Sequence, residues 1–476
     1  MILTCIFCIF TIFFYKNKNI VVFLAKYYNN INTILIKNAK IVNENKIFEG
    51  DVFIKNGKIE LIDKNIDKNA VKEIDATGKY LIPGIIDDQV HFREPGQEYK
   101  ADITSESIAA LSGGVTSFMD MPNNNPPILT QKALENKYNI AKNKSAINYS
   151  FYMGASNDNL DEILKTDISK ICGVKIFMGS STGNLLVDDE KSLENIFSKS
   201  PALIATHCED ETTIVNNNKY YVEKYGKEIT SKYHPLIRSA EACYLSSSFA
   251  VNLAKKHNTR LHVLHLTTAM EMPLFSNIIP LIQKRITAEV CVHHLYFDNT
   301  YYTALGNKIK CNPSIKSPDD KNMLWQALLD DRLDVIATDH APHTKEEKNR
   351  KYIEAPSGLP LVQHSLNIML DFYQKGRISL EKIVEKMCHN PAIVFRIKNR
   401  GFIREGYWAD IAILDPEKKW KVEEDNILYK CKWSPLENKT FKGKVSTVLI
   451  NGKIAMENGI INNISAGKRL EFNAHN

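Results

Sequence analysis

Blocks of basic residues interleaved with aromatic residues are missing from this chain. Its 61 lysines and arginines exceed its 55 acidic residues by only six over 476 residues, and the lysines are scattered among asparagines and isoleucines. Nucleic-acid binding usually requires a clustered basic patch. We therefore expect no nucleic-acid partner.

Paired cysteine motifs are also lacking. The nine cysteines are an odd number and mostly isolated, which is typical of reduced thiols in the cytoplasm. The single Cys-x-x-Cys, formed by Cys5 and Cys8, has no second pair and no histidine at zinc-site spacing. We interpret it as incidental and expect a cytoplasmic protein.

A hydrophobic run long enough to span a membrane is missing as well. Met1–Tyr15 is apolar but shorter than the roughly 20 residues of a spanning helix, and it has neither a basic start nor a signal-peptide cleavage site. We interpret residues 1–30 as an extra segment from a translation start placed too early, with Met1 to about Tyr28 packing against nothing. A membrane anchor is the alternative, but no membrane association is expected.

Both ends of the remaining chain have the pattern of short β-strands. "TILIKNAKIV", "GDVFIKNGKIELI" and "KEIDATGKYLIPG" alternate apolar residues with Asn-Gly and Thr-Gly turns, and "ADIAILDP" and "GKVSTVLINGKIAMENGII" repeat the pattern near the C-terminus. Such sequences predict hairpins. We expect residues 33–82 and 400–476 to pair into one small β-sandwich.

The middle of the chain, residues 83–399, alternates short apolar strands with helical stretches, without internal repeats or low-complexity linkers. This alternation predicts an α/β fold, a (β/α)8 barrel of the TIM type. Polar residues lie within or directly after the strands: His91, Asn123, Lys175, His207, His265, His293, His294 and Asp339. The C-terminal ends of barrel strands converge on one face, so we expect these residues to meet there.

Five of these residues have the chemistry of a metal site. Taken singly, a histidine is more often structural, a strand lysine more often faces solvent, and an aspartate before "HAPH" can cap a helix. Together, the imidazoles of His91, His207 and His265 and the carboxylate of Asp339 suit zinc. Lys175 cannot bind a metal while protonated, but burial would lower its pKa. The free amine could then add carbon dioxide, and the resulting carbamate could bridge two metal ions.

The chain resembles the dihydroorotases of the amidohydrolase superfamily from about Ile34 to its C-terminus. The resemblance is carried by "HFREPG", "MPNNNPP", "VKIFMGSSTGN", "THCED", "HVLHLTT", "AEVCVHHL", "KCNPSIKS", "ATDHAPHTKEEK", "APSGLP", "SPLENKTFKGKVSTVLINGK" and "GKRLEFN". It implies reversible ring hydrolysis of (S)-dihydroorotate to N-carbamoyl-L-aspartate in pyrimidine biosynthesis. It also implies a small-molecule substrate, one or two zinc ions and a homodimer.

The resemblance also implies a role for each residue. His91 and Asp339 would bind the first metal, His207 and His265 the second, and carboxylated Lys175 would bridge them, with Asp339 as general base and acid toward metal-activated water. His262 would be structural. Some similar proteins use a bridging aspartate where this chain has "GSSTGN", so Lys175 is the better candidate. The substrate would contact Arg93, Asn123, Asn312, His343, Ser357 and Gly358, and a contribution from His294 stays open.

Gln89 stands where most members of this family carry the first metal-binding histidine. An amide oxygen is a weaker zinc ligand than imidazole. Gln89 could bind weakly, only the His207–His265 metal could be firmly held, or the protein could have become a scaffold. Because the base, the bridge and the carboxylate-binding residues are all present, we expect an active enzyme.

Two other functions are considered. Allantoinases and hydantoinases share the metal ligands, but a ring amidase with an uncharged substrate has no use for the arginine at position 93. The second alternative is a non-catalytic subunit that binds aspartate carbamoyltransferase or another enzyme of the pathway.

Overall fold

The computed structural model describes residues 33–179, 185–462 and 466–474. The expectation about residues 1–30 falls outside these ranges. Within them, no helix is both long and apolar enough to cross a membrane. The seven cysteines in the described ranges are all buried and form no disulfide.

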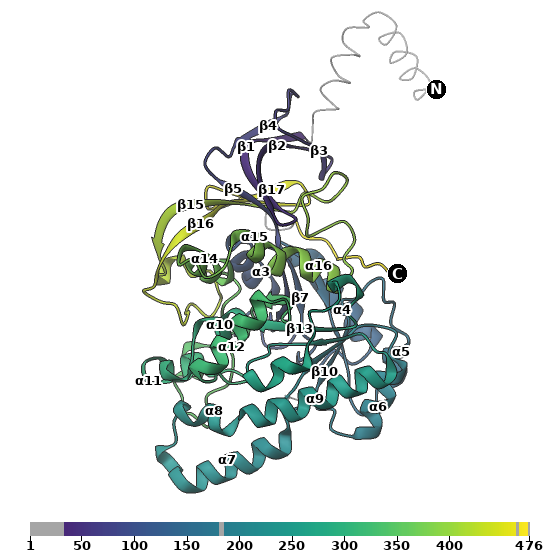
Figure 1. The fold of residues 1–476 in the computed structure, drawn as a ribbon, viewed down its shortest axis with the longest axis vertical. Helices are drawn as coiled ribbons and strands as arrows, with labels where there is room; N and C mark the ends of the chain where they lie inside the picture. Colours follow the sequence, from purple (N-terminus) through teal and green to yellow (C-terminus); the bar gives the residue numbers. More distant parts are fainter. Residues whose placement is uncertain (1–32, 180–184, 463–465, 475–476) are drawn as a thin grey trace, which may run out of the picture.

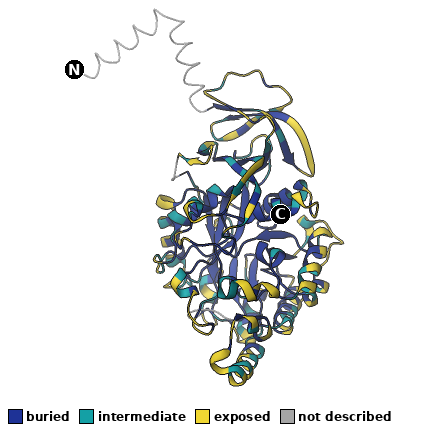
Figure 2. Ribbon diagram, turned by 90° about the vertical axis from the view of Figure 1, so that its left-hand side faces the viewer, coloured by how far each residue is buried: buried dark blue, intermediate teal, exposed yellow. Residues whose placement is uncertain are grey.

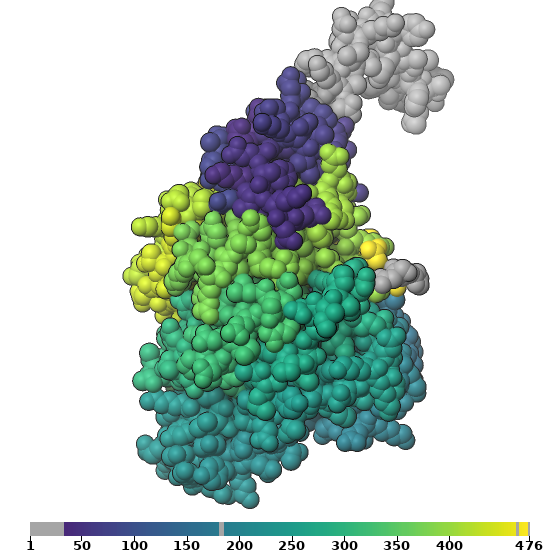
Figure 3. All heavy atoms as spheres, viewed as in Figure 1, coloured from purple at the N-terminus to yellow at the C-terminus, as the bar shows by residue number. Residues whose placement is uncertain are grey.

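Strands from both ends of the chain form one nine-stranded sheet. The strands are β1 (Thr33–Asn43), β2 (Lys46–Lys55), β3 (Lys58–Asp63), β4 (Lys72–Asp75), β5 (Tyr80–Pro83), β15 (Ile411–Lys421), β16 (Thr440–Ile450), β17 (Lys453–Glu457) and β18 (Ile460–Ile461). The two ends meet where β5 pairs antiparallel with β15. Figures 1 and 3 show the purple N-terminal strands beside the yellow-green C-terminal ones, above the teal barrel.

Asn-Gly turns shape this sheet as the sequence predicts. Asn56–Gly57 joins β2 to β3, and Asn451–Gly452 joins β16 to β17, with φ of 52° and 84° in the first turn and 51° and 71° in the second. Two consecutive positive φ angles give the twist that matches a hairpin, and asparagine and glycine tolerate them best. The resulting strands share one apolar core, in which Ile36 packs with Ile411 and Leu449.

Parallel strands form the barrel below this sheet. They are β6 (Ile85–Val90), β7 (Val115–Asp120), β8 (Asn148–Phe151), β9 (Met153–Gly154), β10 (Val174–Phe177), β11 (Ile204–His207), β12 (Leu261–Val263), β13 (Ile286–Cys291) and β14 (Val335–Ala337). Only Tyr152 separates β8 from β9, so these two act as one interrupted strand. The barrel closes where Val90 bridges to His340. Figure 2 shows the strands as a buried interior, as expected for a sheet covered on both faces.

Helices surround the barrel. The longer ones are α3 (Ile103–Ser112), α4 (Gln131–Lys144), α6 (Glu190–Lys199), α7 (Glu211–Tyr225), α9 (Ala240–His257), α12 (Pro318–Leu329) and α14 (Ser365–Gln374). The shorter ones are α5 (Leu160–Leu164), α8 (His234–Ile237), α10 (Val292–Tyr296), α11 (Tyr302–Leu305), α13 (Lys345–Lys348), α15 (Leu380–Val384) and α16 (Asn390–Val394). Many begin at side-chain caps that satisfy backbone N–H groups, such as Asp102, Thr130, Asp189, Ser239 and Ser317.

The predicted fold class, a parallel barrel with a β-rich domain built from both chain ends, is confirmed. The domain limits at residues 33–82, 83–399 and 400–476 remain a proposal. The change of sheet after β5 supports it, because β5 belongs to the nine-stranded sheet whereas β6 pairs with β7 in the barrel.

Asp410 connects the sheet to the barrel. One carboxylate oxygen accepts a hydrogen bond from Asn148 Nδ2 on β8 at 3.1 Å and pairs with Arg400, and the other accepts the backbone N–H of Asn451 at 2.7 Å. Its carbonyl accepts the N–H of Gly84 at 2.9 Å. Because Asp410 and Arg400 are both buried, this group depends on every member being present.

We predict that Asp410→Ala lowers the free energy of unfolding by about 3–5 kcal/mol, because it leaves a buried guanidinium without its carboxylate. Urea unfolding at neutral pH measures this. The control is Glu60→Ala, which removes exposed ion pairs with Lys55 and Lys68 and should cost less than about 1 kcal/mol. Similar small losses for both variants would contradict the role given to Asp410.

Candidate active site

A cavity of about 330 Å³ opens at the C-terminal ends of the barrel strands. The residues given a metal, catalytic or substrate role from the sequence all line it: Gln89, His91, Arg93, Asn123, Lys175, His207, His265, Asn312, Asp339, His343, Ser357 and Gly358. His293 and His294, which were expected at the same face, are not among the lining residues. The lining also includes Gln97, Lys100, Phe177, Ala341 and Pro356, which were not predicted. Their common location supports the predicted set, whereas their roles remain a proposal.

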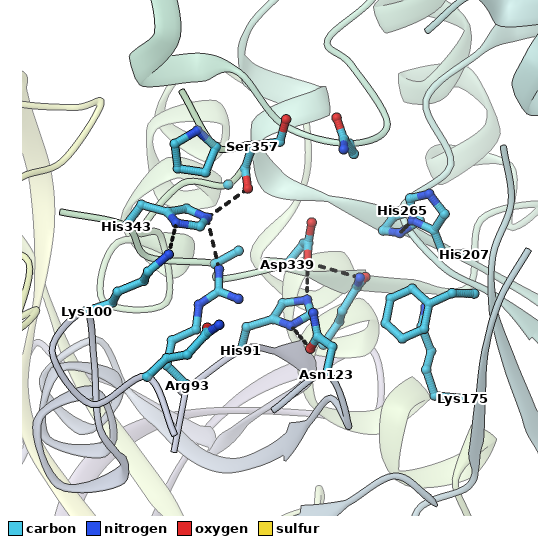
Figure 4. A pocket seen from close by; sticks show the side chains of 17 residues that line it. His91, Arg93, Lys100, Asn123, Lys175, His207, His265, Asp339, His343 and Ser357 are labelled. Atoms are coloured by element: carbon cyan, nitrogen blue, oxygen red, sulfur yellow. Dashed lines mark hydrogen bonds and ion pairs between the residues drawn. The ribbon is translucent and has the colours of Figure 1, made fainter. Parts of the chain in front are cut away.

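The backbone is strained at three of these residues. Arg93, His265 and Asp339 have φ of 67°, 39° and 44°, a left-handed conformation that is uncommon outside glycine and asparagine. Each follows shortly after a barrel strand, where the chain turns and the side chain points into the cavity (Figure 4). Such strain costs about 1–3 kcal/mol per residue and is found mainly at functional sites.

His91 and Asp339 form the first close pair. His91 Nδ1 lies 2.7 Å from Asn123 Oδ1, and His91 Nε2 lies 3.1 Å from Asp339 Oδ1. An amide oxygen only accepts, so Nδ1 carries the proton. In a neutral ring, Nε2 would then direct its lone pair at a carboxylate oxygen. A metal ion at Nε2 would satisfy both atoms.

The surroundings of Asp339 favour its charged form. Burial raises the pKa of this carboxyl group, but the hydrogen bond and charge of His91 outweigh burial, so the net shift is downward.

His207 and His265 form the second pair. His207 Nε2 donates to Glu209 Oε2 at 3.0 Å, so the lone pair on His207 Nδ1 is directed at His265 Nε2, 2.9 Å away. Burial lowers the pKa of both histidines, although the Glu209 carboxylate partly opposes the shift at His207. Both rings are thus neutral, which is the form that binds metals. Among the described residues, His265 Nδ1 has no hydrogen-bond partner.

Lys175 is the unusual member of the site. Its amine is buried, has no hydrogen-bond partner in the described ranges, and lies 4.5 Å from the centre of the Phe177 ring. Burial lowers the pKa of Lys175 to about 7. A large fraction of the amine is therefore uncharged near neutral pH, as carboxylation requires.

These side chains fit a metal such as zinc. Neutral imidazoles, a charged carboxylate and an amine without a partner face one cavity from several strands, and Figure 4 shows His91 and Asp339 between the His207–His265 pair and the Arg93 group. Zinc prefers nitrogen and carboxylate ligands of this kind. Within the cavity, the possible metal ligands lie close together in two pairs, His91 with Asp339 and His207 with His265. Tighter groups of three occur beside it, at Asp88–His262–Glu289 and Cys291–His293–His294.

The group around His262 is explained by its own charges. His262 Nε2 lies 3.1 Å from Asp88 Oδ2 and 3.7 Å from Glu289 Oε2, and these two carboxylates raise the pKa of His262 to about 9 in spite of burial. His262 does not line the cavity. A protonated histidine between two carboxylates accounts for this group without a metal.

Gln89 presents its nitrogen to the first pair. Its Nε2 donates to Asp339 Oδ1 at 3.1 Å, and its Oε1 faces Cys291 Sγ at 3.9 Å. Only the oxygen of an amide can bind a metal ion. The ligand role proposed for Gln89 therefore requires the amide to turn over.

Lys100, which the sequence analysis missed, fixes the state of His343. Lys100 Nζ donates to His343 Nδ1 at 3.0 Å and pairs with Glu347 at 3.0 Å. His343 Nε2 must then carry the ring proton, which it donates to the Ser357 carbonyl at 2.9 Å. Arg93 Nη2 lies 3.2 Å from His343 Nε2. Because this nitrogen carries the ring proton, it cannot accept a hydrogen bond from Arg93, and Nη2 remains available to a ligand. Lys100 lies on an irregular loop without periodicity, so the sequence offered no signal.

Glu209 is the second residue that was missed. It is fully buried, and the charge of Arg238 together with the hydrogen bond from His207 lowers its pKa to about 2 against the opposing effect of burial. The acid two residues after His207 in "THCED" was the available signal. Glu209 orients His207, as partners behind metal-binding histidines commonly do.

Comparison with known proteins gives the class. The amidohydrolase family pattern matches residues 80–455, and the chain belongs to that family. Its relatives include the dihydroorotase of Methanosphaera stadtmanae, 33% identical over 89% of this chain and 96% of the relative, and that of Pyrococcus abyssi, 32% identical over 92% and 98%. Among solved structures, L-hydantoinase (dihydropyrimidinase) from Arthrobacter aurescens has a TM-score of 0.86 with 26% identity, covering 92% of this chain and 99% of that one. The resemblance to dihydroorotases of this superfamily is confirmed.

We predict that Glu209→Gln weakens zinc binding by about 10- to 100-fold, because His207 loses the carboxylate that fixes its ring. Competition with a chelator measures the affinity. Glu194→Gln is the matched control, since Glu194 pairs with His257 at 2.7 Å on a helix outside the cavity. Equal affinities in the two variants would contradict the role of Glu209.

Proposed function

We propose that this chain is a dihydroorotase, a hydrolase that interconverts (S)-dihydroorotate and N-carbamoyl-L-aspartate in pyrimidine biosynthesis. The observation that carries the proposal is the presence of Arg93 in the same cavity as the two pairs of metal-binding residues. Dihydroorotate carries a carboxylate beside its cyclic amide, and a guanidinium matches that group with two parallel hydrogen bonds. The dihydroorotase relatives, which span nearly the whole chain, support the same substrate.

The proposed cofactor is zinc, as one or two ions. His91 and Asp339 would hold one ion, His207 and His265 the other, and Lys175 would bridge them as its carbamate. When bound, zinc activates water and polarises the amide carbonyl. The low pKa of the buried Lys175 amine supports the carbamate.

Asp339 is the proposed general base and acid. It is ionised at neutral pH and lies in the cavity beside His91, so it can take a proton from the attacking water. It can then deliver that proton to the ring nitrogen as the amide bond breaks. In the reverse direction, the same carboxylate takes the proton from the carbamoyl nitrogen.

The remaining cavity residues are proposed to hold the substrate. Arg93 and Asn123 would bind the carboxylate. Asn312, His343 and the Ser357–Gly358 backbone, which line the same cavity, would contact the rest of the substrate. Gly358 is required by space, because a Cβ there would lie 2.3 Å from the Ala341 carbonyl oxygen and φ is 140°. A side chain at this position would displace the loop that forms the cavity wall.

The proposal is tested with the purified chain supplied with zinc and bicarbonate. We expect it to interconvert dihydroorotate and carbamoyl-aspartate, and we expect Asp339→Asn to abolish turnover in both directions. An inactive parent protein with a normal zinc content would favour the non-catalytic subunit. Parental rates in Asp339→Asn would remove the assigned base.

The likeness to L-hydantoinase favours a second candidate, a cyclic amidase for uncharged rings. Arg93→Ala separates the two. We predict that kcat/KM for dihydroorotate falls by about 100-fold or more, because a charge-assisted carboxylate contact is lost. Arg404→Ala, at an exposed ion pair with Glu44, should leave the rate unchanged. An unchanged rate in Arg93→Ala, or faster turnover of hydantoins, would overturn the substrate assignment.

A further prediction concerns Lys100. When Lys100 is replaced, His343 Nδ1 no longer receives a hydrogen bond and can carry the ring proton itself. His343 Nε2 can then accept a hydrogen bond from Arg93, which makes the guanidinium less available to the substrate. We predict that Lys100→Met raises KM about tenfold with a smaller change in kcat. Steady-state kinetics measure both constants, with Lys345→Met as control because Lys345 forms an exposed ion pair with Glu424. An unchanged KM would show that Lys100 does not set the state of His343.

We also propose a cytoplasmic homodimer. The cysteine usage supports the compartment, and the resemblance to dihydroorotases is the basis for the dimer. Sedimentation of the purified chain measures the oligomeric state directly.

A further inference from the structure

A compact group of metal-binding side chains lies beside the cavity at the end of β13. Cys291 is the last residue of that strand, and His293 and His294 follow in α10. The Cys291 sulfur and one nitrogen of each histidine lie within 4.8 Å of one another. None of the three belongs to the predicted catalytic ligands, and none lines the cavity itself.

Three of the four ring nitrogens in this group lack a well-aligned hydrogen bond. Cys291, His293 and His294 are 0%, 0% and 2% exposed. In the described ranges, neither ring nitrogen of His293 makes a well-aligned hydrogen bond, although the ring approaches the Thr338 backbone, and Nδ1 of His294 has no partner. A buried polar atom without a partner loses its hydrogen bond to water and destabilises the fold. Several together in one place require an explanation, such as an ion or a water molecule.

Both histidines are in the form that binds metals. His294 Nε2 lies 3.2 Å from the Pro313 carbonyl and donates to it, so Nδ1 carries a lone pair. Burial lowers the pKa of His293 to about 4, and burial with the charge of His293 lowers that of His294 well below its usual value. Asp339 and the Thr338 backbone oppose the shift at His293 only partly. Two neutral imidazoles therefore face the cysteine.

The surroundings of Cys291 favour a cation. Its sulfur lies 3.5 Å from Glu289 Oε1, and burial together with the negative charges of Glu289 and Asp339 raises the pKa of the thiol. A cation reverses this effect, because the same carboxylates stabilise it and coordination deprotonates the thiol. Gln89 Oε1 is a further oxygen close to the sulfur, 3.9 Å away.

We propose that Cys291, His293 and His294 bind a thiophilic divalent cation, with zinc as the physiological ion and Gln89 Oε1 as the fourth donor. One thiolate, two imidazoles and one oxygen form a tetrahedral set that zinc accepts. Binding forms the metal–sulfur bond and releases the thiol proton to solvent. It also accounts for the orientation of Gln89, whose oxygen faces Cys291 while its nitrogen donates to Asp339. The proposal does not depend on the substrate of the cavity.

Cobalt(II) is the probe that tests this site. The catalytic ligands proposed for the cavity contain no sulfur, so a thiolate-to-cobalt charge-transfer band reports a cysteine ligand. We expect metal-free parent protein titrated with cobalt to develop this band. Cys291→Ala should lose the band and bind about one equivalent less metal per chain, and His293→Gln should bind the sulfur-coordinated ion more weakly. Two control variants should keep the band. They are Cys208→Ser, whose buried thiol donates to Thr206, and Cys388→Ser, whose buried thiol donates to the Pro83 carbonyl.

The proposal is overturned if the parent develops no band, if Cys291→Ala keeps it, or if Cys208→Ser removes it. Should the Cys291 and His293 variants fail to fold, crystals of the cobalt-loaded parent decide the question. An anomalous peak bonded to Cys291 supports the site. A water molecule among these side chains in protein saturated with cobalt overturns it.

Discussion

The closure of the barrel between β6 and the segment after β14 is the constraint on which the site depends. The His91 N–H donates to the His340 carbonyl at 2.7 Å, next to the Val90–His340 bridge. This contact joins residues separated by about half of the chain and sets His91 against Asp339. Without closure of the barrel, nothing would hold His91 next to Asp339. The left-handed turns at Arg93 and Asp339 on either side of this contact are tolerated because it holds them in place.

Removal from water then tunes the residues that the barrel brings together. The same burial that lowers the pKa of the Lys175 amine to about 7 also lowers the pKa of His207 and His265, so one physical cause favours the neutral form of all three side chains. Two of the charged groups that remain are paired, Asp339 with His91 and Glu209 with Arg238. Fixed charges that are held away from bulk water act more strongly on a developing charge than they would in water.

Much of this arrangement could be predicted from the sequence because it depends on local pattern. Asn-Gly turns identified the hairpins, and apolar runs ending in polar residues identified the barrel strands with His207, His265 and Asp339 at their ends. Contacts between distant loops could not be predicted in this way. The hydrogen bond from Lys100 to His343 spans 243 positions, and the orientation of the Gln89 amide depends on neighbours from β13 and the segment after β14. Sequence spacing carries no information about either contact.

The central claim is that this cavity is a working metal hydrolase with glutamine at position 89. The most direct measurement compares the parent with Gln89→His for interconversion of dihydroorotate and carbamoyl-aspartate at increasing zinc concentrations. The account predicts turnover in the parent, with the histidine variant reaching its maximal rate at a lower zinc concentration. A parent that stays inactive at every zinc concentration, beside an active Gln89→His variant, would contradict the claim and show that the metal centre has been lost.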